Sequence, residues 1–145
     1  MAITQALANS FKKQLLDGDH SFASASDVYK IALYTSSATL NSATTSYTTG
    51  NEVGNSGQYS AGGGKLTGNN TSIASGVAIV DFADRSFTGV TLTARGALIY
   101  NTSSTATNAA VAALDFGADK TATSGTFTIQ FPAFTTAAAI LRISG

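Results

Sequence analysis

The sequence contains no cysteine and no tryptophan, and only one proline, one methionine and one histidine among its 145 residues. The missing cysteine excludes a disulfide framework and a thiolate zinc site. Only 11% of the residues are charged, whereas a catalytic site usually gathers several side chains whose pKa values can be tuned. The composition therefore favours binding or assembly over catalysis, and we expect neither enzymatic activity nor a bound cofactor.

The charges that are present balance, eight basic against eight acidic residues. A neutral surface has no field that would attract nucleic acid or an acidic membrane, and it gives little protection against self-association. We therefore expect a component of a larger assembly that contacts neither nucleic acid nor a membrane. The apolar stretches are too short to span a bilayer and the first residues lack the basic start of a secretory signal, so a soluble protein made in the cytoplasm is expected.

Four large apolar side chains near the start of the chain recur at every fourth position: Ile3, Leu7, Phe11 and Leu15. This spacing places them on one face of an α-helix, and Gly18 is typical of the residue just past a helix end. We predict an amphipathic helix over residues 2–16. Such a helix either covers the end or open face of a sheet, or is an arm that docks on a partner.

The rest of the chain is rich in Thr, Val, Ile and Phe. Alternating or continuous apolar residues predict strands at 29–35, 77–82, 87–93, 97–100, 109–116, 126–131 and 138–143. Residues 36–64 are mostly Ser, Thr, Asn and Gly and predict a long polar loop. The three glycines at its end imply either flexibility or a backbone path that no Cβ would allow.

Short strands that do not alternate with helices are typical of antiparallel sandwiches and barrels. We predict an all-β fold, an antiparallel β-sandwich of jelly-roll or Greek-key type with one N-terminal amphipathic helix. The chain is expected to form a single domain over residues 1–145, with the sandwich over 28–145. Segments 77–85 and 111–120 share a pattern of apolar strand, Asp-Phe and charged turn, so one hairpin plan is expected twice.

Candidate chemical groups are few. Asp17, Asp19 and His20 are potential metal ligands, but no Glu closes an EF-hand loop after them, so a solvated loop and no metal site are expected. The run 61–68 resembles a phosphate loop only superficially, because Leu66 stands where Ser or Thr should follow the lysine.

Four aspartates could in principle act as paired carboxylates of a glycosidase: Asp81, Asp84, Asp115 and Asp119. All four are expected at strand ends or turns, where Asp commonly bonds backbone N–H groups. Arg95 interrupts an apolar stretch and is expected to form a structural ion pair or a subunit contact.

Several blocks, in their order along the chain, resemble a group of small structural proteins of tailed bacteriophages: 1–16, 29–35, 51–53 with 59–63, 94–101, and 114–117 with 126–132. The resemblance implies a virion component, in particular a capsid decoration (cement) protein at the capsid surface. Its partners would be the major capsid protein and other virion subunits, and it would form a homo-oligomer, with a trimer expected. Such a protein would clamp neighbouring capsomers through contacts that symmetry repeats.

The candidate partner interface is the predicted helix, with Ile3, Leu7, Phe11 and Leu15 as its apolar anchor, or the loop 36–64. Other roles remain open. One is a tail, neck or fibre component. Another is a host-surface binding module, for which the obvious aromatic material is Tyr47, Tyr59 and Tyr100. The third is a small hydrolase, which the shortage of His and Cys disfavours.

Overall fold

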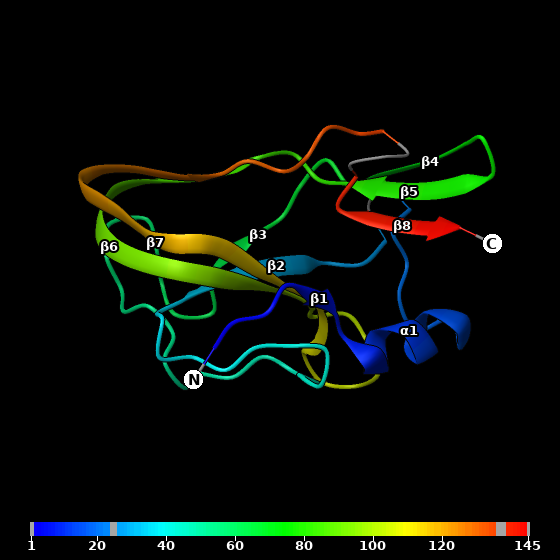
Figure 1. Cartoon of the computed structure of the whole chain (residues 1–145), viewed down its shortest axis with the longest axis horizontal. Coiled ribbons are helices and arrows are strands. Elements are labelled where there is room, and N and C mark those ends of the chain that lie inside the picture. The colour runs from blue at the N-terminus through cyan, green and yellow to red at the C-terminus, as the bar shows by residue number, and fades with distance from the viewer. Residues whose placement is uncertain (1, 24–25, 136–138, 145) are drawn as a thin grey trace.

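The computed structural model describes residues 2–23, 26–135 and 139–144 as a mainly β protein with two antiparallel sheets and one short helix (Figure 1). The elements in chain order are β1 (Ala6–Leu7), α1 (Asn9–Leu16), β2 (Tyr29–Tyr34), β3 (Gly64–Lys65), β4 (Asn70–Ala74), β5 (Val77–Asp81), β6 (Arg85–Asn101), β7 (Ala109–Ile129) and β8 (Leu141–Ser144). The large sheet has the order β1-β7-β6-β2-β3 and the small sheet β4-β5-β8. The predicted class, an antiparallel all-β fold with one N-terminal helix, is confirmed.

The long hairpin of β6 and β7 forms the centre of the large sheet, with 17 and 21 residues in its two strands. The sequence predicts four shorter strands here, and the structure joins them in pairs. Shifts in the register between β6 and β7 accommodate the residues that interrupt the apolar pattern. The second charged turn, expected near Asp115, is therefore wrong: Gly117 adopts φ +81° there and β7 continues beyond it.

The prediction of one helix over residues 2–16 is wrong in its first half. The helix begins only at Asn9, and Ala8 before it is extended, with φ −65° and ψ 135°. β1 pairs with the edge of β7, and Ile3 forms a bridge to Leu40. Backbone hydrogen bonds to existing strands override the helical spacing. This segment is part of the sheet and not a detachable arm.

The loop predicted over 36–64 contains no strand until β3, and it packs closely on the large sheet. Leu40, Val53 and Tyr59 are all buried. At its end, Gly63 has φ +81°, and a Cβ there would lie 1.8 Å from the carbonyl oxygen of Ile31. The glycine run therefore serves a backbone path that no Cβ would allow.

The small sheet contains one strand that the sequence did not predict. β4 has five exposed residues and no apolar alternation. A tight turn joins it to β5 through Ser75 and Gly76, both with positive φ, as two-residue hairpins require. The strands predicted at 29–35 and 77–82 are confirmed as β2 and β5. The last predicted strand, over 138–143, is found as β8 only from Leu141; residues 139 and 140 are not strand, and Ala138 lies outside the described residues.

Aromatic rings connect the two sheets and the helix. Phe22 stacks on Tyr29 of β2 with ring centroids 4.6 Å apart, and Tyr29 contacts Phe82 at 5.7 Å. Phe82 follows β5 and contacts Phe131 at 5.8 Å. Phe11 of α1 reaches the same cluster through Phe22 at 6.0 Å. These rings form one contiguous core with the large sheet.

We expect Phe11→Ala to lower the free energy of unfolding by about 3–5 kcal/mol, because it removes a buried ring from this core. Phe11 is only 2% exposed, whereas Leu16 of the same helix is 90% exposed. The control Leu16→Ala should therefore change stability by less than about 0.5 kcal/mol. Chemical denaturation followed by circular dichroism measures both, and equal effects would show that α1 does not belong to the core.

Gly18 and Gly63 both have a φ of +81°. Comparing alanine variants at the two positions distinguishes the cost of backbone strain from the cost of a steric collision. At Gly18 an added Cβ meets nothing within 4 Å, so Gly18→Ala should cost roughly 1–2 kcal/mol. At Gly63 the Cβ would collide with backbone, so Gly63→Ala should cost more than about 3 kcal/mol. Denaturation midpoints of both variants test this, and similar losses would contradict the tight packing of the glycine run.

Candidate partner-binding groove

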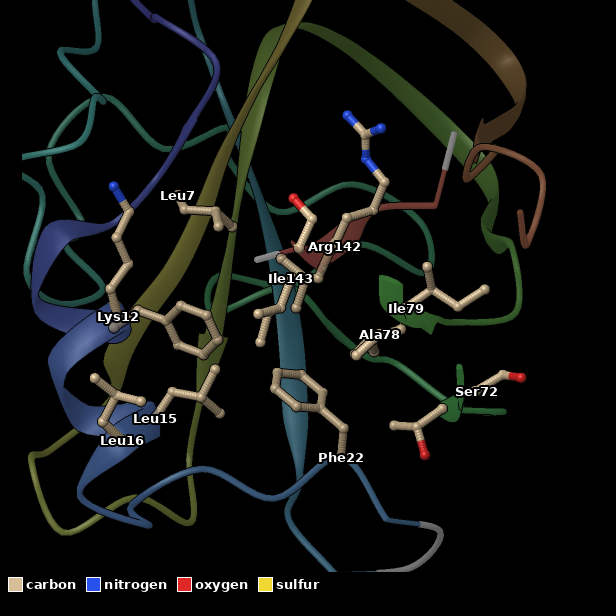
Figure 2. A pocket seen from close by; sticks show the side chains of 15 residues that line it. Leu7, Lys12, Leu15, Leu16, Phe22, Ser72, Ala78, Ile79, Arg142 and Ile143 are labelled. Carbon is tan, nitrogen blue, oxygen red and sulfur yellow. The ribbon is translucent and has the colours of Figure 1, made fainter. Parts of the chain in front are cut away.

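An open hollow of about 570 Å³ lies between α1 and the small sheet, and we call it the α1–β8 groove (Figure 2). Its lining is mainly apolar. The helix side contributes Leu7, Phe11, Leu15, Leu16 and Phe22, and the sheet side contributes Ala78, Ile79, Val80, Leu141 and Ile143. A partner that removes apolar surface of this kind from water gains free energy of binding.

The sheet wall of the groove follows from strand register. Ile73, Ala78 and Ile143 lie opposite one another on β4, β5 and β8, so they share one face of the small sheet. Leu141 lies two residues before Ile143 on the same face and is 5% exposed, whereas Ile143 is 57% exposed and Ile73 is 72% exposed. The core-facing surface of the small sheet thus extends beyond the part that the chain itself covers.

The helix wall and the floor complete the groove. Phe11 and Phe22 form a buried floor, and Leu16 stands 90% exposed. Lys12 and Arg142 are the charged residues that line the groove. The arrangement offers apolar contact area beside two positive charges, as a binding surface does.

The four predicted contact residues do not form a single helical face. Ile3 and Phe11 are buried in the chain's own core, while Leu7 and Leu15 are partly buried and line the groove. Sequence reasoning missed Ile143, whose exposure depends on where β8 sits at the sheet edge. The role of these four residues in partner contact stays a prediction.

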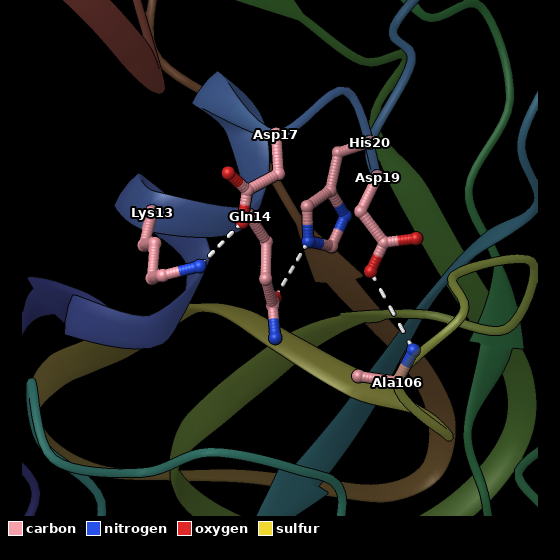
Figure 3. Close-up of polar contacts among 6 residues, drawn as sticks. All are labelled: Lys13, Gln14, Asp17, Asp19, His20 and Ala106. Carbon is pink, nitrogen blue, oxygen red and sulfur yellow. Dashed lines mark hydrogen bonds and ion pairs between the residues drawn. The ribbon is translucent and has the colours of Figure 1, made fainter.

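The acidic cluster after the helix has structural partners (Figure 3). Asp17 forms an ion pair with Lys13 at 2.6 Å. A carboxylate oxygen of Asp19 accepts a hydrogen bond from the Thr105 backbone N–H at 2.7 Å, and this bond lowers the pKa of Asp19. Among the residues that the structure describes, no group of three or more His, Cys, Asp or Glu could hold a metal ion.

The one histidine of the chain is buried between the helix and the sheet. Asn101 Nδ2 donates to His20 Nδ1 at 3.0 Å, and His20 Nε2 donates to Gln14 Oε1 at 2.9 Å. The ring also packs on Phe11, with centroids 4.9 Å apart. Burial lowers the pKa of His20, although Asp19 and Asp27 oppose the shift. The neutral ring therefore ties α1 to the end of β6.

Two of the four aspartates considered as catalytic carboxylates also bond backbone. The pKa of Asp115 is lowered by a hydrogen bond from the Gly117 N–H and then by Arg95, whose Nε lies 3.0 Å from Asp115 Oδ1. This bond confirms the structural ion pair predicted for Arg95. Asp84 accepts a hydrogen bond from the Phe131 N–H at 2.8 Å. These contacts anchor the β7 bulge and the segment before β8.

Of the three tyrosines considered for a host-binding site, two are buried and Tyr47 is partly buried. Tyr59 and Tyr100 are buried, and Tyr47 stacks on Tyr100 with centroids 4.8 Å apart. Tyr47 and Tyr59 both donate to the carboxylate of Glu52, which also accepts the Gly62 N–H at 2.7 Å. Burial raises the pKa of Tyr100 to about 12. The Glu52 hydrogen bonds tie the 36–64 loop to itself, and the Tyr47–Tyr100 stacking ties the loop to β6 of the large sheet.

Known proteins add no constraint on the role of the groove. The chain matches no protein-family model, no curated protein and no solved structure. Within residues 2–23, 26–135 and 139–144, no helix is long and apolar enough to cross a membrane.

Acidification should destabilise the fold through His20. Its pKa in the folded state lies below the ordinary value of 6.5, so the unfolded chain binds a proton more readily. The stability from the neutral ring is fully present above about pH 6.5 and is lost as the pH falls toward the folded pKa. His20→Gln should remove the slope of unfolding free energy between about pH 7 and 5. Asp115→Asn is the control that should retain it, and an unchanged slope in His20→Gln would refute the assignment.

Proposed function

We propose that this chain is a structural protein of a tailed-bacteriophage virion, and that it decorates the capsid by clamping neighbouring capsomers. The observation that carries the proposal is the α1–β8 groove. Leu16 and Ile143 stand exposed at its two walls, and Ile73 extends the sheet wall. A partner that covers these side chains gains roughly 1.5–3 kcal/mol for each one that becomes fully buried. The resemblance of the sequence to phage structural proteins indicates that the partner is another virion subunit.

The mode of action is physical and involves no catalysis. A neutral chain does not repel its own copies, and a contact of modest strength becomes strong when symmetry repeats it over a shell. The partners are the major capsid protein and further copies of this chain, with a trimer expected. The contact surface moves from the predicted helical arm to the groove, since Ile3 and Phe11 are already buried in the core.

A tail, neck or fibre component could use the same groove but would occur in few copies. Quantitative mass spectrometry of purified virions, scaled against the major capsid protein, distinguishes these roles. Decoration requires a copy number equal to that of the capsid subunit, or a simple fraction set by capsomer symmetry. A few copies per particle would move the protein to the tail or neck, and absence from the virion would refute the proposal.

Reconstitution on capsids that lack the protein tests the groove itself. Leu16→Lys places a charge on the exposed helix wall, and it should weaken binding to such shells at least about tenfold. Thr123→Lys adds the same charge at an exposed position of β7, away from the residues that line the groove, and should bind normally. Co-sedimentation measures both variants, and equal binding would exclude the groove as the capsid contact.

A further inference from the structure

The hydrogen bonds around His20 fix the position of its proton. The ring is 6% exposed. Its Nδ1 lies 3.0 Å from Asn101 Nδ2, and its Nε2 lies 2.9 Å from Gln14 Oε1 (Figure 3). An amide nitrogen can only donate, so Nδ1 must accept and the proton of the neutral ring must lie on Nε2. The site therefore fits the neutral ring, in one of its two tautomers.

Asn101 cannot turn over to accept a proton from Nδ1. Its side chain is completely buried, its Oδ1 accepts the Ser103 N–H at 2.8 Å, and its Nδ2 also donates to Asp27 Oδ2 at 2.7 Å. A reversed amide would place two donors together at Ser103 and two acceptors together at Asp27. A proton on Nδ1 would therefore face another N–H, and a buried donor without an acceptor is costly.

The titratable groups on the segments that pack around the ring are Lys12, Lys13 and Asp17 of α1, Asp19 and Asp27 of the following loop, and Tyr29 of β2. Asp19 and Asp27 favour the charged ring, but burial outweighs them and lowers the pKa of His20. Lys13 and Asp17 pair with each other at 2.6 Å. Burial raises the pKa of Tyr29, so its hydroxyl stays neutral.

The ring joins the second half of α1 to the large sheet. It lies between Asn101 at the end of β6 and two residues of the helix, bonding Gln14 and packing on Phe11 with centroids 4.9 Å apart. Loss of the ring from this place would leave both helix residues without that contact. The attachment of the helix therefore depends on a ring that fits only when it is neutral.

The segments on either side of this turn are attached independently of His20. The N–H groups of Ala8 and Asn9 donate to backbone carbonyls of β7 and of the 36–64 loop, at 2.9 and 2.7 Å. After the helix, the Asp19 carboxylate accepts the Thr105 N–H at 2.7 Å. A change at the ring would therefore be confined to the end of the helix.

We infer that protonation of His20 releases the last turn of α1 from the large sheet while both sheets stay folded. The charged ring loses its partner at Asn101 and turns into water, and its contacts with the helix are lost with it. Leu15 and Leu16 belong to this turn and to the helix wall of the α1–β8 groove, so acid opens the groove. The release is a property of the free chain and does not depend on the proposed function.

The pH range of the release follows from linkage. The buried ring has a pKa below the ordinary value of 6.5, which the released ring regains. The population of the released state should therefore rise by up to about tenfold for each pH unit below about pH 6.5, until the pH reaches the pKa of the buried ring.

Nitrogen NMR of the ring in the unchanged protein tests the starting state. At about pH 7.5, His20 should show the shifts of a ring that is protonated on Nε2 and bare on Nδ1. A ring protonated on Nδ1 at this pH would overturn the inference, because Asn101 would then already be reversed.

Hydrogen exchange in the same protein measures the release. The Asp17 amide, which donates to the Lys13 carbonyl at 3.0 Å, should lose protection at least about tenfold between about pH 7 and pH 5, after correction for the intrinsic exchange rate. Its midpoint should follow the ring titration. The amides of Leu98 and Ile99 in β6 should stay protected. Equal losses in β6, or a ring that titrates without any loss in α1, would overturn the local release.

Variants connect the effect to the ring. His20→Gln carries an amide that does not titrate, so protection of the Asp17 amide should change less than about twofold over the same range. Asp115→Asn removes a titrating group at the β7 bulge and should keep the full response. An unchanged response in His20→Gln would also overturn the inference. If that variant does not fold, the ring shifts and the exchange rates of the unchanged protein decide.

Discussion

The contact between Phe22 and Tyr29 is the interaction on which the rest of the structure depends. Tyr29 belongs to β2 of the large sheet, and its ring also contacts Phe82 at the end of β5. Phe11 joins α1 to the same rings. Aromatic side chains bury large areas and prefer tilted or offset contacts, so a few of them set the spacing between the helix and both sheets.

That spacing explains the groove. The aromatic cluster occupies the space between α1 and the base of the small sheet, and the sheet then continues past it. Leu141 is covered by the core, but Ile143 is not. The chain supplies enough apolar side chains to fill the centre and leaves the end of the small sheet uncovered. Within the described residues, this exposed apolar end is therefore a consequence of how the core is built.

The polar groups serve the same architecture. Glu52 holds the long loop through two tyrosine hydroxyls and a backbone N–H, and His20 holds the helix through Asn101 and Gln14. Buried polar groups require such partners, because an unpaired one costs free energy. His20, Asp19, Asp84 and Asp115, which the sequence offered as candidate chemical groups, thus serve as structural contacts.

By itself, the sequence determined the β class, the strands β2 and β5, the position of the last strand and the long polar loop, because apolar alternation and turn residues act locally. The backbone role of the glycine run, which the sequence left open, came from the structure. Only the tertiary structure decided that residues 2–8 are extended, that interrupted runs join into β6 and β7, and that β4 exists. It alone placed Ile143 and Leu16 on the two walls of one groove. A helical spacing records which side chains are apolar, but the edge of a neighbouring strand decides the backbone conformation, and no local pattern reveals which edges remain open.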